Sequence, residues 1–294
     1  MTPASETAAA SAVEPAWAKI NLYLEVLARR ADGYHDLDSL AVFADVGERL
    51  QARPAQDLSL AIGGPMGAAL AAERDNLVLR AARRLRDAAG NDRLGAALYL
   101  DKHIPVAAGL GGGSADAAAA LRLLNRFWQL DWAFERLLPL AQDLGADVPA
   151  CLLSQSCYLR ETGRLIDAVE GIPTLPILLV NPGVHVATAQ VFKHIRPRGA
   201  GPRPLAWQGT GADAFAAALA PRANDMTAAA IALAPAIRQC LDALAALPSP
   251  LLVRMSGSGA TCFAIFASEL AAKHAAAMLA ARFPNWYIHA TATK

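Results

Sequence analysis

Long apolar runs, an excess of basic charge and closely spaced cysteines are all missing from this sequence. No apolar run reaches the roughly 18 residues that a membrane-spanning helix needs, so we expect no membrane contact. With 27 Lys and Arg against 26 Asp and Glu, the net charge of +1 disfavours a nucleic-acid-binding surface. The four cysteines have no C-x-x-C spacing, which disfavours a zinc site and favours buried free thiols in a reducing cytoplasm.

The N-terminal residues lack the charged start and the apolar centre of a signal peptide. We therefore expect residues 1–13 to form a mobile leader and the protein to be cytoplasmic. The 294 residues, of which 54% are hydrophobic, suffice for one large domain or two ordinary ones. A Gly- and Pro-rich change in composition at 171–176 predicts two domains, at residues 14–172 and 173–294.

Apolar and polar residues alternate strictly from Ala18 to Leu27, which predicts a half-buried strand. This strand places Lys19 and Asn21 side by side on its polar face. In the rest of the first domain we expect strands at residues 40–46, 58–62 and 96–104, helices from 75 to 90, at 114–128 and at 135–144, and a hairpin at 157–166.

The second half of the chain has the order of elements of a split βαβ, or ferredoxin-like, layer. Strands are expected at 177–180, 251–255, 261–266 and 286–292, and helices at 189–194, 231–247 and 269–282. A Gly- and Pro-rich segment at 196–210 is expected to be a mobile loop.

A glycine-rich turn between an expected strand and an expected helix is the centre of the chain. Four glycines occupy the five positions from Gly109 to Gly113, and an Ala-rich helix begins at about Ser114. Because glycine has no Cβ, the backbone can approach a bulky anion closely. The first turn of the helix adds free N–H donors and a partial positive charge, which suit phosphate. The stretch therefore predicts a cradle for the phosphates of a nucleotide.

Two familiar glycine motifs do not fit this turn. A P-loop ends in Gly-Lys-Ser/Thr, and no lysine follows Gly113. The dinucleotide pattern G-x-G-x-x-G matches Gly109 and Gly111 but has Ser114 in the place of its third glycine. A glycine hinge before a core helix stays an alternative.

Three other features fit a phosphate cradle: a lysine on a strand, an aspartate at a helix start and a second Gly/Ser turn at 256–259. Phosphoryl transfer from ATP needs positioning, charge neutralisation and a carboxylate that takes the acceptor's proton. Asp147 is a candidate for this base, and Lys19 is a candidate for the cation that keeps it ionised. Taken singly, Lys19 can equally be a solvated side chain and Asp147 a structural helix cap.

Four motifs, in order along the chain, resemble those of the GHMP small-molecule kinases. Residues 105–118 resemble the superfamily signature, Pro-x-x-x-Gly-Leu-Gly-Gly-Gly-Ser followed by Asp-Ala-Ala. The opening Ala-Lys-Ile-Asn-Leu at 18–22, with Asp-Gly-Tyr-His at 32–35, is similar to one branch of this superfamily. The segments 144–149 and 256–260 are similar to the same branch, and the resemblance runs from about residue 14 to the C-terminus.

The resemblance implies an α+β fold of two domains. The N-terminal one would be a ribosomal-protein-S5-domain-2-like domain that binds ATP, and the C-terminal one a ferredoxin-like (split βαβ) domain that binds the substrate. The branch of the GHMP superfamily that these motifs resemble phosphorylates the 2-hydroxyl of 4-diphosphocytidyl-2-C-methyl-D-erythritol in non-mevalonate isoprenoid synthesis, so the resemblance implies this activity. The expected cofactors are ATP and Mg²⁺, with the metal ligands unknown. We expect a small-molecule substrate, no nucleic-acid or membrane partner, and a monomer or weak homodimer.

The resemblance also implies site residues. Lys19 and Asp147 match the catalytic pair. The cofactor-binding residues would be Asn76, Lys102, Pro105, Val106, Ala107, Ala108, Gly109, Leu110, Gly111, Gly112, Gly113, Ser114 and Ala115. The substrate-binding residues would be Asn21 at the erythritol end, Tyr34, His35 and Phe192 around the cytosine, and Thr188 in the substrate cleft.

Two positions depart from the family pattern. Ala115 stands where a second Ser is usual, which puts in doubt any contact of that hydroxyl with phosphate or Mg²⁺. Trp17 replaces the usual Pro two places before Lys19, which changes the entry to the strand but not its alternation.

Two other functions stay open at this point. The chain could be another GHMP kinase, of the homoserine or mevalonate type, although the Tyr34-His35 pair favours a cytidyl substrate. It could also be a non-catalytic nucleotide-binding protein on the same fold, against which the presence of both Lys19 and Asp147 speaks. Tyr34 and His35 can also be ordinary loop residues, and Phe192 a core residue.

Overall fold

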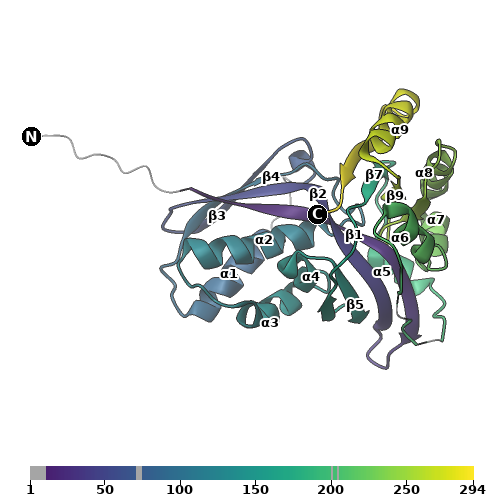
Figure 1. Cartoon of the computed structure of the whole chain (residues 1–294). Helices are drawn as coiled ribbons and strands as arrows, with labels where there is room; N and C mark the ends of the chain where they lie inside the picture. The colour runs from purple at the N-terminus through teal and green to yellow at the C-terminus, as the bar shows by residue number, and fades with distance from the viewer. Residues whose placement is uncertain (1–10, 71–74, 200, 204) are drawn as a thin grey trace, which may run out of the picture. The chain divides into compact units, whose positions relative to one another are not determined.

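A computed structural model describes residues 11–70, 75–199, 201–203 and 205–294 (Figure 1). These residues form two compact units. Unit 1 consists of the described residues up to 16 together with 47–104 and 113–152, and unit 2 of 17–46, 105–112 and 153–294. The long strands β1 (Ala12–Arg29) and β2 (His35–Arg53) pair with each other and contribute to both units.

The structure describes only the last residues of the expected leader, and it leaves the expected domain limits untested. Residues 1–10 of the expected leader lie outside the described residues, whereas Ala12 and Val13 belong to β1. The domain limits at 14–172 and 173–294 stay a prediction.

Unit 1 contains a sheet in which β4 (Ala96–Asp101) lies between two partners. It pairs in parallel with β3 (Leu58–Gly63) and antiparallel with the second half of β2, where Arg49 faces Asp101. Its helical elements are η1 (Gly67–Leu70), α1 (Leu77–Ala89), α2 (Gly112–Phe127), α3 (Phe134–Leu144) and α4 (Val148–Leu153). Helix α1 packs against β3 and α3.

The ends of α1 follow from local sequence signals. Asn76 precedes the helix, and its Oδ1 accepts the N–H of Val78 at 2.9 Å. Gly90 ends it in the left-handed region at φ +64°, where its N–H donates to the Asp87 carbonyl at 3.0 Å. The start and the end predicted for this helix are therefore confirmed.

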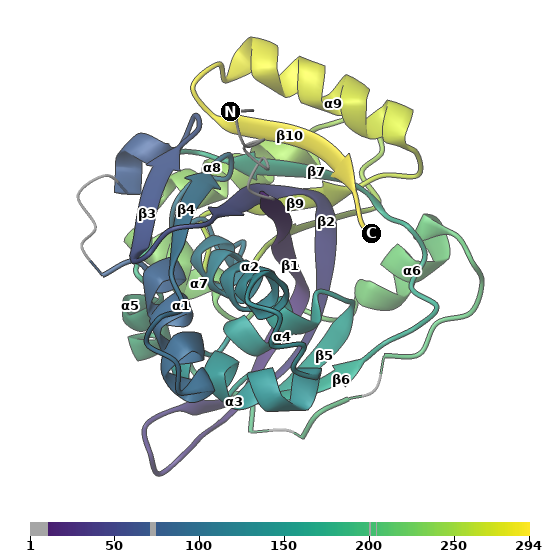
Figure 2. The ribbon, with the colours of Figure 1, turned by 90° about the vertical axis from the view of Figure 1, so that its left-hand side faces the viewer.

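Unit 2 contains an antiparallel four-stranded sheet in the order β10 (Tyr287–Ala292), β7 (Pro176–Asn181), β9 (Cys262–Ile265), β8 (Leu252–Met255). Helix α9 (Glu269–Arg282) packs along β10 and β7 (Figure 2). Helix α8 (Ala236–Ala245) packs on β8 and β9. This arrangement confirms the ferredoxin-like layer that the order of elements predicts.

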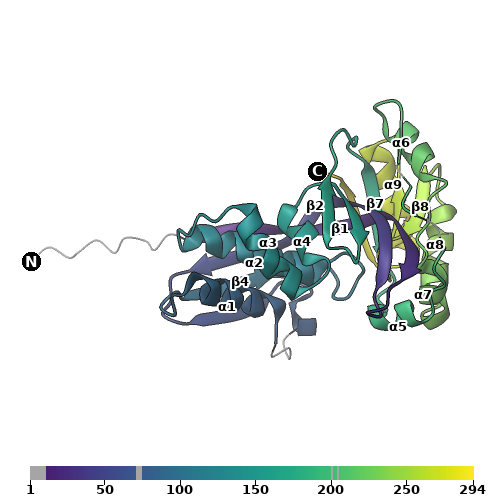
Figure 3. The same cartoon turned by 90° about the horizontal axis from the view of Figure 1, so that it is seen from below.

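In the chain, the other elements of unit 2 either precede β7 or lie between β7 and β8 (Figure 3). The predicted hairpin is confirmed as β5 (Cys157–Glu161) and β6 (Leu165–Ala168), with β5 antiparallel to the first half of β2. The single helix predicted at 231–247 is instead α7 (Thr227–Leu233) followed by α8, because Pro235 lacks the N–H that a continuous helix needs. The remaining helices are α5 (Thr188–Lys193) and α6 (Ala212–Leu219), of which α6 has no counterpart among the predicted elements.

Strand β1 is not half-buried, as its alternation predicts, but buried on both faces. Lys19, Asn21, Tyr23 and Glu25 are each at most 3% exposed. A buried polar group is costly unless it has a partner. The Tyr23 hydroxyl accordingly donates to Asp38 at 3.1 Å, and burial together with the charge of Asp38 strongly raises the pKa of this tyrosine.

The buried Glu25 binds three arginines that lie far along the chain. Its carboxylate is 2.9 Å from Arg198, 2.7 Å from Arg203 and 3.0 Å from Arg222. The backbone N–H of Arg198 also donates to Val26 at 2.9 Å. Arg198 and Arg203, two residues of the segment that composition marks as a mobile loop, are thus bonded to β1, and these partners explain why the polar face of the strand is covered.

Candidate functional site

The glycine turn lies in unit 2 up to residue 112, whereas residues 113–115 belong to unit 1. In unit 2, three successive carbonyl groups, those of residues 108–110, accept hydrogen bonds. The Ala108 carbonyl accepts the N–H of Thr261 at 3.0 Å, and the Leu110 carbonyl accepts the N–H of Lys19 at 2.9 Å. Between them, the Gly109 carbonyl accepts the Ser256 hydroxyl at 2.9 Å. The C=O and the N–H of one trans peptide point in opposite directions. The N–H groups of residues 109–111 therefore point away from the segments that hold the turn.

The backbone of this turn has a positive φ at alternate residues. The values are +53° at Ala107, +74° at Gly109 and +63° at Gly111. Such alternation is typical of turns whose successive N–H groups converge on an anion. The local geometry therefore suits a phosphate group, as the glycine pattern predicts.

Lys19 and Asn21 are adjacent on the polar face of β1. The Lys19 Nζ donates to the Asn21 Oδ1 at 3.0 Å, and the backbone N–H of Asn21 donates to the Ser256 Oγ at 3.1 Å. Because Ser256 also binds Gly109, one hydroxyl connects β1 to the glycine turn. Unit 2 thus brings together Lys19, Asn21, the glycine turn and the second Gly/Ser turn.

The residues implied for the cytidyl substrate form further contacts in unit 2. The rings of His35 and Phe192 stack with centroids 5.2 Å apart and an angle of 20° between their planes. The hydroxyls of Thr188 and Ser258 are 2.7 Å apart, whereas Tyr34 is 64% exposed. His35 and Phe192 are therefore neighbours, as a shared role requires, although binding of a base by them stays a prediction.

Lys102 forms a buried charge cluster in unit 1. Its Nζ lies 2.7 Å from both Glu48 and Asp116, and the lysine side chain is 2% exposed. Burial alone would lower the pKa of Lys102, but the charges of Asp116 and Glu48 outweigh it and raise this pKa. No sequence pattern points to Glu48, whereas Asp116 lies inside the glycine motif at a position for which no role is predicted. Contact of Lys102 with a nucleotide stays a prediction.

We expect Lys102→Met to lower the free energy of unfolding by about 3–5 kcal/mol, because it leaves two buried carboxylates without their cation. Urea unfolding of both proteins measures this difference. Arg84→Met is the matched control, since Arg84 pairs with Asp143 at 2.8 Å on the surface and should change the value by at most about 1 kcal/mol. Equal losses in the two variants would contradict the assignment of a buried cluster.

Asp147 and Asn76 lie in unit 1. Asp147 is half-buried and directly precedes α4, and its carbonyl accepts the N–H of Cys151 at 3.1 Å. Asn76 is the cap of α1 described above. Since Asp147 belongs to unit 1 and Lys19 to unit 2, the catalytic pairing of these two residues stays a prediction.

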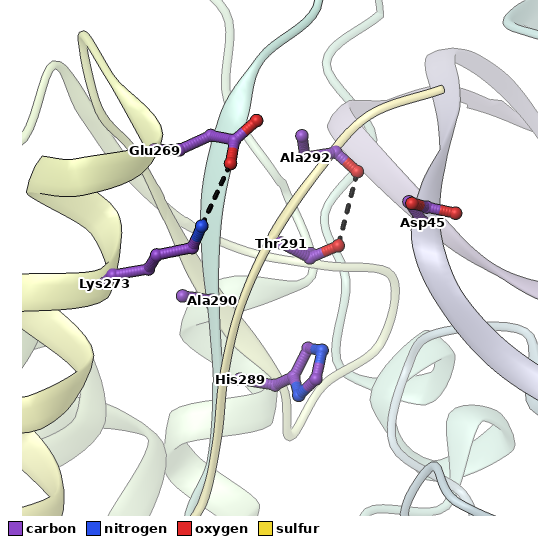
Figure 4. A pocket seen from close by; sticks show the side chains of 7 residues that line it. All are labelled: Asp45, Glu269, Lys273, His289, Ala290, Thr291 and Ala292. Atoms are coloured by element: carbon purple, nitrogen blue, oxygen red, sulfur yellow. Dashed lines mark hydrogen bonds and ion pairs between the residues drawn. The ribbon is translucent and has the colours of Figure 1, made fainter.

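A small hollow on unit 2 contains none of the predicted site residues (Figure 4). Asp45, Glu269, Lys273, His289 and residues 290–292 line it, and Lys273 pairs with Glu269 at 3.1 Å. The hollow is therefore separate from the glycine turn.

Among the helices of the described residues, none has the length and the apolar character of a membrane span.

Comparison with protein families gives the class of the chain. Residues 76–155 match the GHMP kinases N terminal domain, and residues 210–285 match the GHMP kinases C terminal domain. Each half of the chain therefore carries a domain of the same superfamily.

Comparison with individual proteins gives the family within this class. The 4-diphosphocytidyl-2-C-methyl-D-erythritol kinase of Rhodospirillum rubrum is 47% identical over 96% of this chain and 93% of its own length. The protein of the same name from Cereibacter sphaeroides is 50% identical over 92% of this chain and 95% of its own. A solved 4-(cytidine 5'-diphospho)-2C-methyl-D-erythritol kinase is 33% identical, covers 96% of this chain and 99% of its own, and has a TM-score of 0.78. The chain therefore belongs to the 4-diphosphocytidyl-2-C-methyl-D-erythritol kinase family, and its predicted α+β GHMP fold is confirmed.

Proposed function

We propose that this protein transfers the γ-phosphoryl group of ATP to the 2-hydroxyl of 4-diphosphocytidyl-2-C-methyl-D-erythritol, a step of non-mevalonate isoprenoid synthesis. The observation that carries the proposal is the glycine turn, whose carbonyls are bound on one side so that the N–H groups of 109–111 face the other. Lys19, on the strand that holds this turn, adds a positive charge in the same unit. N–H donors and a cation are what phosphoryl transfer requires.

The proposed roles follow the motifs of the family. The backbone of residues 105–115 binds the phosphates, with Asn76 and Lys102 near the nucleotide. Asp147 takes the proton of the 2-hydroxyl as the new P–O bond forms, and Lys19 stabilises the charge that develops. Around the acceptor, Asn21 contacts the erythritol end, Tyr34, His35 and Phe192 hold the cytosine, and Thr188 lines the cleft.

Mg²⁺ would neutralise the β- and γ-phosphates of the bound ATP. This ion usually keeps several waters and takes few protein ligands beside the phosphates. Among the described residues, no group of three or more His, Cys, Asp or Glu could hold a metal ion. We therefore propose that the nucleotide phosphates and water supply most of the ligands of the ion. We further propose that the protein works in the cytoplasm. We also propose that it is a monomer or a weak homodimer, and size-exclusion chromatography would test this oligomeric state.

A substrate panel tests the proposed reaction. ADP release from ATP is measured with the cytidyl substrate, with homoserine, with mevalonate and without an acceptor. We expect release only with the cytidyl substrate, and a phosphomonoester product in the ³¹P spectrum. Release with mevalonate or homoserine instead, or release that no acceptor stimulates, would overturn the proposal.

We expect the KM for the cytidyl substrate to be constant above pH 6.5 and to rise in more acidic solution. Burial and the charge of Arg29 lower the pKa of His35 from its ordinary 6.5, so the ring is neutral above that pH and can accept a hydrogen bond. Protonation removes this acceptor. His35→Gln keeps a polar group that does not titrate, so its KM should vary less from about pH 5 to 8. Identical profiles for the two proteins would assign the titration to another group.

A further inference from the structure

Ser39 lies on β2 within unit 2 and belongs to none of the motifs, yet it contacts the neighbour of Lys19. The residue is 1% exposed. Its Oγ accepts the Asn21 Nδ2 at 2.8 Å and donates to the Tyr23 carbonyl at 2.5 Å. Ser39 therefore joins two residues of β1 through a single hydroxyl.

The direction of these hydrogen bonds fixes the orientation of the Asn21 amide. A hydroxyl has one hydrogen, and the Tyr23 carbonyl can only accept, so that hydrogen is committed to Tyr23. The Ser39 oxygen can then offer only lone pairs to Asn21, which must present its NH₂ group. The amide oxygen is consequently turned toward the Lys19 Nζ, 3.0 Å away.

The reversed amide would be unfavourable at both ends. An ammonium group has donors and no acceptor, so an NH₂ group facing Lys19 could form no hydrogen bond with it. The amide oxygen would then face the lone pairs of Ser39. The backbone of Asn21 is held separately, because its N–H donates to the Ser256 Oγ at 3.1 Å. Rotation of the side-chain amide is thus the freedom that Ser39 removes.

We propose that Ser39 is a positioning residue that sets the orientation of the Asn21 amide and, through it, directs the Lys19 ammonium group. This inference rests on the proposed function, in which Lys19 stabilises the charge of the transferred phosphoryl group. Ser39 itself acts through Asn21 and touches neither ATP nor the acceptor.

Steady-state kinetics of Ser39→Ala and Ser39→Thr test the inference. We expect Ser39→Ala to lower kcat about 10-fold with little change in the KM for ATP, because the Asn21 amide can then rotate and its hydrogen bond to Lys19 is no longer fixed. Ser39→Thr keeps the hydroxyl and should restore kcat. In an Asn21→Leu background, Ser39→Ala should cause no further fall, because the residue through which it acts is gone.

Thr293→Val is the matched control. Thr293 is also buried, and its hydroxyl accepts the N–H of Leu175 at 2.8 Å. Neither residue belongs to the glycine turn, so this variant should lose stability but not kcat. If Ser39→Ala does not fold, Ser39→Cys fills the site with a slightly larger group that is a weaker acceptor, and it should lower kcat less. Wild-type kcat in the folded variant, or a loss that adds fully to that of Asn21→Leu, would overturn the inference. Failure of the wild-type protein to phosphorylate the cytidyl substrate would instead overturn the proposed function.

Discussion

Asp147→Asn is expected to lower kcat by about 10²- to 10⁴-fold with little effect on the KM for ATP. Asparagine is nearly isosteric with aspartate, but its amide cannot take the proton of the acceptor hydroxyl. The main-chain bond from Cys151 to the carbonyl of residue 147 does not depend on this side chain, so α4 should begin at the same place. ADP release with saturating ATP and cytidyl substrate measures the effect.

A neighbouring acid gives the control for this experiment. Asp143 is an exposed residue of α3 that pairs with Arg84 at 2.8 Å. Asp143→Asn removes one negative charge close by in the sequence and should leave kcat unchanged. Turnover close to that of the wild type in a folded Asp147→Asn protein would remove Asp147 from the role of base.

The parts of the fold that could be predicted from the sequence are those set by local signals. Helix α1 begins after Asn76 and ends at Gly90 because an Asx cap and a left-handed glycine act within a few residues. Helix α9 has the predicted bounds, Glu269–Arg282, for a similar reason, since Ser268 caps its N-terminus. The ferredoxin-like order follows from the succession of such elements.

The burial of β1 could not be predicted because its causes are distant in sequence. Alternation shows that one face of the strand is polar, and polar faces are ordinarily solvated. Here Glu25 is covered by arginines, among them Arg198 and Arg222, that follow it by more than 170 residues. Nothing in a window of ten residues could show that these partners meet.

The candidate site likewise contains residues that sequence patterns indicate and residues that such patterns miss. The glycine turn is visible in the sequence because glycines gathered between a strand and a helix allow the positive φ and the close approach that an anion site needs. Ser39, Glu48 and Asp116 act through hydrogen bonds and ion pairs that need the folded backbone, and a serine in a strand has no distinctive pattern. Sequence patterns therefore indicate the groups proposed to contact phosphate and miss those that orient or neutralise their neighbours.

Gly109→Ala is expected to destabilise unit 2 and to weaken ATP binding. A Cβ on Gly109 would lie 2.5 Å from the Ser256 carbonyl oxygen and 2.7 Å from that of Gly259. Both are backbone atoms, so they cannot move aside as the end of a side chain could. The φ of +74° adds a cost of about 1–2 kcal/mol for any residue with a Cβ, and the overlap adds about 1–3 kcal/mol.

Gly90→Ala separates the two costs of Gly109→Ala. Gly90 also has a positive φ, +64°, but nothing lies within 4 Å of the position of its Cβ. This variant should therefore lose only the conformational part, about 1–2 kcal/mol, and should bind ATP normally. Urea unfolding and ATP titration of both variants measure the difference. Equal losses of stability, with ATP affinity intact in Gly109→Ala, would mean that the turn does not need the close approach to Ser256, and the phosphate site would then have to lie elsewhere.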